Sequence, residues 1–372
     1  MKASIEQTEL FRAMGRVQSI VERRTTIPIL SNVLIEARDG QVLLRTTDLD
    51  IEVLDKVKAM VEVPGSLTVG ANTFHDIVKK LPDGSQIQLI GDASSNKLEI
   101  LASRSRFFLS TLPKEDFPIM ASEEYEAEFL ASAKIVKRLF EKSKFAMSSE
   151  ETRYYLNGVY LHPCEEEGKN FLRAVATDGH RLAQIDVEPP SNMSQFTGVI
   201  VPKKTVSELR MVLETESNEI SISVSNNKIR FSNDTLTLTS KVVDGTFPDY
   251  KRVIPVNNEK KLQVNAAEFS EAVDRVSTVS SDRSRAVKLS IGSGKLHLTV
   301  NSPENGKAED ELLVNYSDEE LEIGFNARYL QELTSQVDGE RVEFSFRSSG
   351  DPALMRDVDD SGAMYVVMPM RV

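Results

Sequence analysis

Two short acidic motifs contain the first residues in this sequence whose types and spacing could perform chemistry. The residues Asp48-Leu49-Asp50 place two carboxylates two positions apart, as a bound cation would require. The residues Thr177-Asp178-Gly179-His180 place a carboxylate beside an imidazole, as a general acid–base pair would require. Neither motif has further ligands at metal-binding spacing, and the sequence contains no Walker loop, GxGxxG or HExxH motif. We therefore expect neither catalysis nor a bound metal or cofactor.

The composition indicates a globular protein of a reducing compartment. The single cysteine, Cys164, cannot form an intrachain disulfide, and its place directly after Pro163 gives no reason to expect a nucleophile. The N-terminus shows no apolar leader, and no apolar run reaches the roughly 18 residues of a membrane span. We expect a cytoplasmic protein.

A basic segment, residues 132–144, stands out in this acidic chain. Its five Lys and Arg residues minus one Glu give +4, whereas the chain carries −12. Three apolar residues recur at helical spacing and predict a face directed toward a core: Ile135, Leu139 and Phe140. Beside them runs a row of cations at i, i+4 and i+8: Lys134, Arg138 and Lys142. In an isolated helix such a row is usually only solvated, so its meaning depends on the rest of the chain.

The order of predicted elements indicates three tandem repeats. A first type of helix is predicted at 6–17, 132–144 and 266–276, with Leu10, Ile135 and Phe269 in register. A second type is predicted at 73–81, 204–213 and 327–337, with Phe74, Val206 and Leu330 in register. Strand-like segments separated by turn residues follow each helix. The sequence therefore predicts an α+β fold of three similar domains, each with two helices and antiparallel strands, at 1–126, 127–258 and 259–372.

The repeats separate the charges of the chain. The predicted helices carry clusters of Lys and Arg, whereas residues 302–322 carry eight acidic residues against one Lys, a net charge of −7. Basic helices combined with acidic strands predict a face that binds a polyanion through its phosphates, without reading bases and with salt-dependent affinity. Three similar units in a row favour an arc that closes on itself or with a second copy. The alternative is a monomeric scaffold for acidic partners, which a 41.5 kDa monomer in solution would favour.

Six strings in the sequence resemble one family in the expected order. They are RTTIPILSN (24–32), RSRFFLSTLPKEDFP (104–118), TRYYLNG (152–158), VATDGHRLA (175–183), DGTFPDYKRV (244–253) and AMYVVMPMRV (363–372). Together they resemble the beta subunits of bacterial DNA polymerase III, the sliding clamps. The resemblance implies a head-to-tail homodimeric ring of six similar domains with helices lining a hole around duplex DNA. It also implies a non-catalytic, nucleoid-associated tether for the polymerase catalytic subunit, the clamp loader and other clamp-binding proteins.

The resemblance also implies a pocket for partner peptides between the second and third domains. Its walls of aliphatic and methionine side chains would accept Leu or Phe side chains. The residues carried over by motif are Tyr155, Leu156, Thr177, Gly179, His180, Arg181, Leu182, Pro248, Arg252, Val253, Val366, Val367, Met368, Pro369, Met370 and Arg371.

Two further sets of residues follow. By motif, the expected DNA contacts are Arg24, Arg153 and Tyr154, and the basic-helix argument adds Lys203, Lys204, Lys134 and Arg138. The expected dimer interface joins the first domain of one chain to the third domain of the other, through Arg104, Arg106, Phe107, Leu109, Thr278, Val279 and Glu304. The sequence departs from the familiar pattern at Thr278, Pro352 and Val372.

Overall fold

The protein is described by a computed structural model that covers residues 1–22, 25–92, 96–121, 123–215, 217–280 and 285–371. These residues form two compact units whose boundary cuts through the second repeat. Unit 1 comprises Met1–Val136, Pro190–Thr197 and Lys204–Val242, and unit 2 comprises Lys137–Pro189, Gly198–Lys203 and Val243–Val372. None of the described helices is long and apolar enough to cross a membrane.

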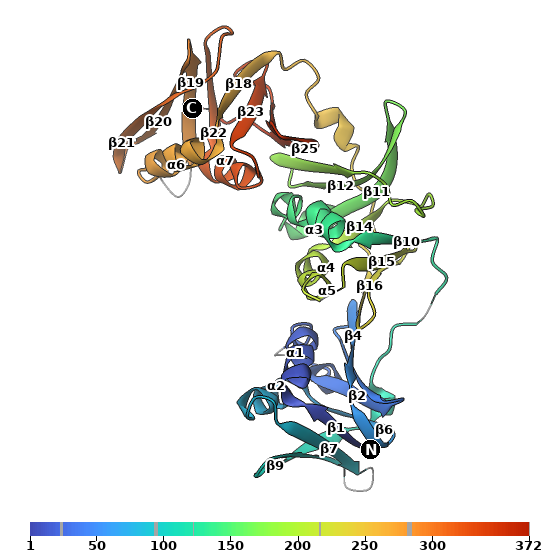
Figure 1. Ribbon diagram of the computed structural model, residues 1–372. Helices are drawn as coiled ribbons and strands as arrows, with labels where there is room; N and C mark the ends of the chain where they lie inside the picture. The colour runs from blue at the N-terminus through green and yellow to red at the C-terminus, as the bar shows by residue number, and fades with distance from the viewer. Residues whose placement is uncertain (23–24, 93–95, 122, 216, 281–284, 372) are drawn as a thin grey trace. The chain divides into compact units, whose positions relative to one another are not determined.

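The first repeat lies in unit 1 and places two helices on one face of its strands (Figure 1). Its elements are β1 (Lys2–Glu6), α1 (Gln7–Gln18), β2 (Asn32–Arg38), β3 (Gln41–Thr47), β4 (Ile51–Lys58), β5 (Met60–Val63), β6 (Gly65–Gly70), α2 (Ala71–Lys80), β7 (Gln86–Asp92), β8 (Lys97–Ala102) and β9 (Ser105–Leu112). Helix α1 buries Leu10, Met14 and Val17, which recur about one turn apart, and packs on β3 and β4.

The second repeat contributes strands to both units. Its elements are β10 (Ala127–Ser132), α3 (Ala133–Glu141), β11 (Gly158–Glu166), β12 (Lys169–Thr177), β13 (Arg181–Val187), β14 (Val199–Pro202), α4 (Lys203–Glu208), α5 (Arg210–Leu213), β15 (Glu219–Val224), β16 (Lys228–Ser232) and β17 (Leu236–Lys241). Helices α4 and α5 together occupy the segment predicted as one helix.

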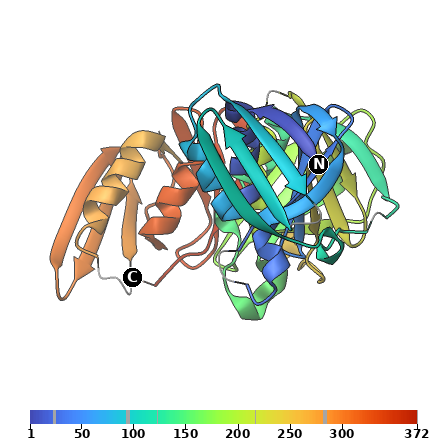
Figure 2. The ribbon, with the colours of Figure 1, turned by 90° about the horizontal axis from the view of Figure 1, so that it is seen from below.

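The third repeat lies in unit 2, and its helices α6 and α7 pack side by side (Figure 2). Its elements are β18 (Lys260–Asn265), α6 (Ala266–Ser277), β19 (Ala286–Gly292), β20 (Lys295–Ser302), β21 (Gly306–Leu313), β22 (Leu321–Asn326), α7 (Ala327–Thr334), β23 (Arg341–Phe346), β24 (Ala353–Asp357) and β25 (Asp360–Val367). Each helix starts at an asparagine whose side chain accepts backbone N–H groups of the first turn, Asn265 for α6 and Asn326 for α7.

Hydrogen-bonded ladders run across the repeat boundaries. Unit 1 holds a 13-stranded antiparallel sheet in the order β10-β15-β16-β17-β4-β3-β2-β6-β9-β8-β7-β1-β5, in which β17 of the second repeat pairs with β4 of the first. Unit 2 holds an 8-stranded sheet, β14-β11-β12-β13-β25-β24-β23-β18, in which β25 of the third repeat pairs with β13 of the second. A 4-stranded sheet, β21-β20-β19-β22, completes the third repeat.

The predicted fold of three α+β repeats is confirmed, and one predicted register is corrected. The second-type helices begin at Ala71, Lys203 and Ala327, so Phe74, Val206 and Leu330 do coincide, as predicted. The first-type helices begin at Gln7, Ala133 and Ala266, which places Val136, not Ile135, level with Leu10 and Phe269. The reason is packing, because Val136 is fully buried whereas Ile135 is half-exposed.

Candidate functional site

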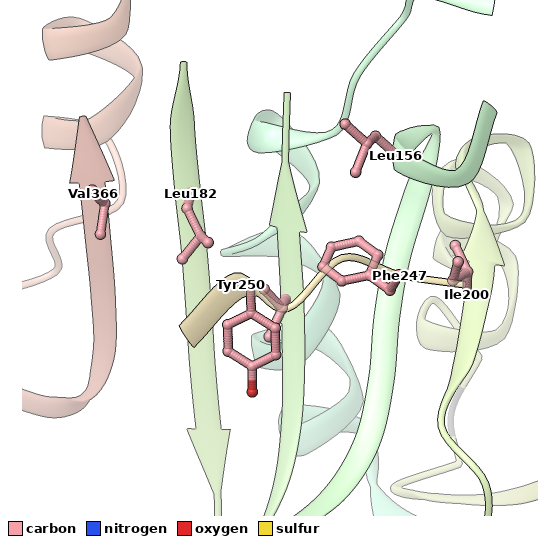
Figure 3. Close-up of a cluster of buried hydrophobic side chains, with 7 residues drawn as sticks. Leu156, Leu182, Ile200, Phe247, Tyr250 and Val366 are labelled. Carbon is pink, nitrogen blue, oxygen red and sulfur yellow. The ribbon is translucent and has the colours of Figure 1, made fainter. Parts of the chain in front are cut away.

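A cluster of buried apolar side chains joins the second and third repeats within unit 2 (Figure 3). We call it the junction cluster, and its members are Leu156, Val175, Leu182, Ile200, Phe247, Tyr250 and Val366. They come from the 3₁₀ helix Glu151–Leu156, from β12, β13, β14 and β25, and from residues 243–258, the joining segment between the repeats. Val366 lies directly opposite Leu182 in the β13–β25 ladder, so the two repeats build one continuous apolar surface.

The joining segment is held against the sheet by stacking and by buried hydrogen bonds. Phe247 stacks on Tyr160, with ring centroids 5.0 Å apart and ring planes 7° apart. The Tyr250 hydroxyl donates to Nε2 of His162 at 3.0 Å and accepts from Nη1 of Arg173 at 3.3 Å. These contacts fix the position of the Pro248–Val253 stretch, which carries three of the predicted pocket residues.

Burial sets the protonation states of this network. Nδ1 of His162 lies 3.0 Å from the carbonyl oxygen of Pro163, so we assign the ring proton to Nδ1 and leave Nε2 as the acceptor for Tyr250. Burial lowers the pKa of His162 and raises the pKa of Tyr250 to about 12, which keeps both groups neutral. The guanidinium of Arg173 is fully buried and pairs with both carboxylate oxygens of Asp186, at 2.6 and 2.8 Å.

The two acidic motifs are structural turns. The Thr177 hydroxyl donates to the carbonyl four residues ahead, and Oδ1 of Asp178 accepts the backbone N–H groups two and three residues ahead. Thr47 and Asp48 make the same set of bonds in the first repeat. The two motifs are therefore equivalent turns in the first and second repeats, and the same hydrogen bonds hold the two aspartates in place.

Beyond the turn, Arg181 connects the second repeat to α7. Its guanidinium bonds to Asp178 at 3.1 Å and to Glu332, and it lies 4.5 Å above the ring of Tyr329. His180 stacks on the same ring at 6.3 Å. Arg181 is buried and holds the turn at Thr177 against α7, whereas the neighbouring His180 is exposed.

Two cavities lie beside the residues that connect the second and third repeats. One, of about 480 Å³, is lined by His180 and by Asn326 and Tyr329 of the third repeat. The other, of about 400 Å³, lies between the joining segment and residues 347–352. Asn326 and Tyr329 were missed from the sequence, where the only signal was an aromatic residue beside the register-matched core position of α7.

The C-terminal tail closes the site. Val366 and Val367 are buried in β25, and the chain then leaves the sheet. The Met368 N–H donates to the His180 carbonyl at 2.8 Å, and the Met370 N–H donates to the Gly324 carbonyl at 2.8 Å. The Met368 side chain is 39% exposed and forms part of the smaller cavity, so an apolar, adaptable side chain is available at the surface.

The remaining predicted pocket residues surround this surface to different degrees. Tyr155 packs against the junction cluster, and Val253 is half-exposed at the smaller cavity. Arg252 points to solvent and pairs with Asp249 at 2.8 Å. Exposed or half-exposed positions are also found at Gly179, Pro248, Pro369 and Arg371.

The residues predicted to contact DNA are placed unequally. Arg24 lies outside the described residues. Tyr154 is exposed, whereas Arg153 bonds to Glu150 at 3.2 Å and donates to the carbonyl of Asp178 at 3.4 Å. The loop that carries both residues is thus tied to the turn beside the junction cluster.

The lysines predicted to contact DNA differ in their partners. Lys203 is exposed and its Nζ donates to Oγ of Ser149 at 2.6 Å. Lys204 pairs with Asp48 within unit 1. Lys134 is exposed and has no ion-pair partner among the residues that the structure describes.

Two members of the predicted row of cations, Arg138 on α3 and Lys142 just after it, form ion pairs within the chain. Arg138 pairs with Asp360 at 2.6 Å, a hydrogen bond that raises the pKa of the guanidinium, and Lys142 pairs with Asp338 at 2.7 Å. Both acids belong to the third repeat, so these cations join two repeats within unit 2. Their charges are balanced by acids of the same chain.

The predicted interface residues of the first repeat lie on β9 or in the turn before it. They are Arg104, Arg106, Phe107 and Leu109. Strand β9 pairs fully with β8, but with β6 only at Thr111 and Leu112, so its remaining edge is unpaired among the described residues. Phe108 is 56% exposed on this strand.

The predicted interface residues of the third repeat lie at the end of α6 and in the turn before β21. Strand β21 pairs only with β20 and forms an outer edge of its sheet among the described strands. Glu304 is exposed in the turn that precedes it. Thr278 ends α6, where its hydroxyl donates to the Asp274 carbonyl at 3.2 Å, and Val279 is half-buried.

Three family models match successive parts of this chain. The model for the N-terminal domain of the DNA polymerase III beta subunit matches residues 1–121. The model for the central domain matches residues 131–249, and the model for the C-terminal domain matches residues 251–371.

Relatives with names and solved structures resemble the chain over its full length. The "Beta sliding clamp" of Caulobacter vibrioides is 46% identical over 372 residues, and that of Escherichia coli K12 is 38% identical over 376 residues, with 100% of each chain covered. A sliding clamp from Bartonella birtlesii, solved with griselimycin bound, is 48% identical with a TM-score of 0.96. A Caulobacter crescentus beta sliding clamp is 47% identical with a TM-score of 0.96, and both structures are covered completely.

Proposed function

This chain belongs to the family of DNA polymerase III beta subunits, the beta sliding clamps, and on that premise we propose how it performs this role. Two copies close head to tail into a ring around duplex DNA. The ring binds the phosphate backbone without reading sequence, and it tethers the replicative polymerase and other proteins through the junction cluster and the tail. The protein acts in the cytoplasm and catalyses no reaction of its own.

The observation that supports the ring best is the pair of unpaired edges on β9 and β21. Within the chain, β17, the last strand of the second repeat, pairs with β4 of the first repeat. In the same way β25, the last strand of the third repeat, pairs with β13 of the second repeat. By their order in the repeats, β9 is the counterpart of β17 and β25, and β21 is the counterpart of β4 and β13. Among the described strands, the counterpart pairing for β9 is therefore with the β21 of a second copy, and the reverse pairing closes a dimer.

The side chains along the two edges suit this pairing. Arg104 lies in the turn before β9, and Arg106 lies on β9, where it also pairs with Glu99. Glu309 and Glu311 are exposed on β21. Leu313 is 79% exposed at the end of β21 and offers an apolar contact for the exposed ring of β9. Backbone pairing, opposite charge and exposed apolar area thus support the same interface.

For the tether, we propose that partner peptides insert Leu or Phe side chains between the joining segment, the turn at Thr177 and the tail. A Pseudomonas aeruginosa clamp, like the Bartonella clamp, was solved with griselimycin bound. We propose that this chain binds griselimycin at the junction cluster, which makes griselimycin a probe for the site.

Retention on DNA tests the proposed ring. The loaded protein is expected to stay on nicked circular DNA and to leave within the same period once a restriction enzyme linearises that DNA, because a closed ring is held by topology. Gel filtration of the DNA with labelled protein measures the retained fraction. The dimeric mass, about twice 41.5 kDa, is checked on the same sample by mass photometry.

Equal loss from circular and linear DNA would contradict the ring. A charge-reversed variant, Arg106→Glu, serves as the control, since a weakened edge should release circles faster. A protein that remains a monomer at micromolar concentration would favour the monomeric scaffold.

Reversing the unpaired charges of α3 is expected to weaken DNA association. Lys134 and Lys137 are exposed and have no ion-pair partner among the described residues. The double variant Lys134→Glu, Lys137→Glu should lower affinity several-fold at about 50 mM salt and much less at about 200 mM, because phosphate contacts release counterions. Fluorescence anisotropy with a labelled duplex measures the difference. Lys58→Glu, at the exposed end of β4, is the control, and a salt-independent effect would contradict the electrostatic explanation.

A further inference from the structure

The chain contains a second junction with the same construction as the site. In unit 1, β17 pairs with β4 between the first two repeats, just as β25 pairs with β13 in unit 2. The identical hydrogen-bonded turns at Thr47 and Thr177 show which residues correspond. Each turn directly precedes the strand that pairs with the following repeat, β4 in unit 1 and β13 in unit 2. Counting from these turns, Glu52 is the counterpart of Leu182.

The strand ladders identify three further pairs of corresponding residues, and we call the four positions of each junction its floor. Thr239 lies opposite Glu52 in unit 1, as Val366 lies opposite Leu182 in unit 2. Two positions before the turn threonine, Arg45 corresponds to Val175. The ladder of β2 with β6 places Thr68 where β11 with β14 places Ile200.

At the first junction these four floor positions are polar, whereas at the second they are apolar. Nη1 of Arg45 donates to Oε1 of Glu52 at 2.6 Å. Oε2 of Glu52 accepts the backbone N–H of Met120 at 2.9 Å. The Thr68 hydroxyl donates to the Leu112 carbonyl at 2.9 Å, so both Glu52 and Thr68 hold hydrogen bonds within the chain.

The residues around this floor are nevertheless apolar and buried in both junctions. Leu30 and Phe117, the counterparts of Leu156 and Phe247, remain buried in one apolar cluster. Above the floor, Lys241 pairs with Asp50 at 3.0 Å, at the positions that Met368 and His180 hold in the second junction. The first junction therefore repeats the architecture of the site with the opposite chemistry.

We propose that the first junction is a counterpart of the peptide pocket that its polar floor closes to apolar ligands, so that each chain binds one partner peptide. An apolar side chain placed there would displace Glu52 from its hydrogen bonds and gain no apolar contact in return. Arg45, Glu52, Thr68 and Thr239 thus restrict recognition to the junction of the second and third repeats. The inference rests on the proposed peptide site.

Stoichiometry with griselimycin tests the inference on the unmodified protein. Isothermal titration is expected to give one griselimycin per chain. Two per chain would overturn the inference and leave the proposed function standing, whereas no binding would overturn the proposed peptide site itself.

Replacing the polar floor residues by apolar ones tests whether they are what excludes apolar ligands. The triple variant Arg45→Val, Glu52→Leu, Thr239→Val is made in a full chain whose own pocket is disabled by deletion of residues 368–372. The chain that lacks residues 368–372 but is otherwise unchanged should bind no griselimycin. The same chain with the triple substitution should give a binding signal at least about tenfold above the detection limit of the assay. A variant that melts within a few degrees of the parent and binds nothing overturns the inference.

The reverse change covers the case in which the triple variant does not fold. Val366→Thr installs the first junction's Thr239 in the otherwise unmodified second junction, and the two side chains have nearly the same shape. Griselimycin affinity is expected to fall about tenfold, because a hydroxyl now lies in the apolar floor. Val63→Thr, on the exposed edge strand β5, should change nothing. Unchanged affinity of Val366→Thr would overturn the inference.

Discussion

Deleting residues 368–372 is expected to weaken binding of griselimycin and of a labelled Leu-Phe peptide by at least about 30-fold. The deletion removes the exposed Met368 side chain from the cavity wall and both hydrogen bonds that hold the tail, to His180 and to Gly324. Removing a central, well-packed anchor of an interface costs about 2–4 kcal/mol, which corresponds to a factor of about 30 to 1,000. Fluorescence anisotropy of the labelled peptide measures the loss.

The control for the deletion is the oligomeric state. The proposed edges β9 and β21 lie far from the tail in sequence, so the dimeric mass should be unchanged. A deletion variant with unchanged peptide affinity would show that the pocket lies elsewhere. Met60→Ala, on β5, is a matched methionine control that should bind normally.

Replacing Arg173 by Met is expected to cost about 3–5 kcal/mol of the free energy of unfolding of unit 2. The guanidinium is buried, pairs with Asp186 and Glu166, and donates to the Tyr250 hydroxyl. Without it, Asp186 keeps a charge with no partner of comparable strength. Urea unfolding followed by circular dichroism measures the loss, and peptide affinity should fall as well, because Tyr250 anchors the joining segment.

The pH dependence separates a lost ion pair from lost packing. The hydrogen bond from Arg173 lowers the pKa of Glu166, so the stability from this pair is present above the ordinary carboxyl pKa and is lost as the pH falls through the lowered value. The variant should lack this acid-side decline. Arg12→Met, which removes an exposed pair with Glu9, should cost less than about 1 kcal/mol. An equally small effect of Arg173→Met would contradict the buried-network interpretation.

The sequence predicted the repeats well because helical periodicity leaves few choices where apolar residues are sparse. Phe74 and Val206 each have polar neighbours on both sides in the sequence, so their register follows directly. In α3, two apolar residues, Ile135 and Val136, stand side by side and permit two registers. Only tertiary packing selects Val136, and so the predicted register was off by one.

Long-range ion pairs explain most of what the sequence could not show. Arg138 and Asp360 are 222 positions apart, and no local pattern connects them. The same holds for Tyr250 with His162, 88 positions apart, which fix one wall of the site. Charge counts along helices predicted a basic face, but the acids of a neighbouring repeat neutralise part of it. The motif strings, in contrast, brought Leu156, Leu182 and Val366 together correctly.

The offset between repeats and compact units has a mechanical consequence. Because β4 pairs with β17 and β13 with β25, melting the connecting loops alone would not part neighbouring repeats, since a strand-to-strand ladder would still have to be sheared. Such ladders resist shear along many bonds at once. In the proposed ring, the joint between two chains would lack any covalent connection, so it is the place where the assembly could part while every chain remains intact. A machine that opens the proposed ring would therefore act on β9 or β21.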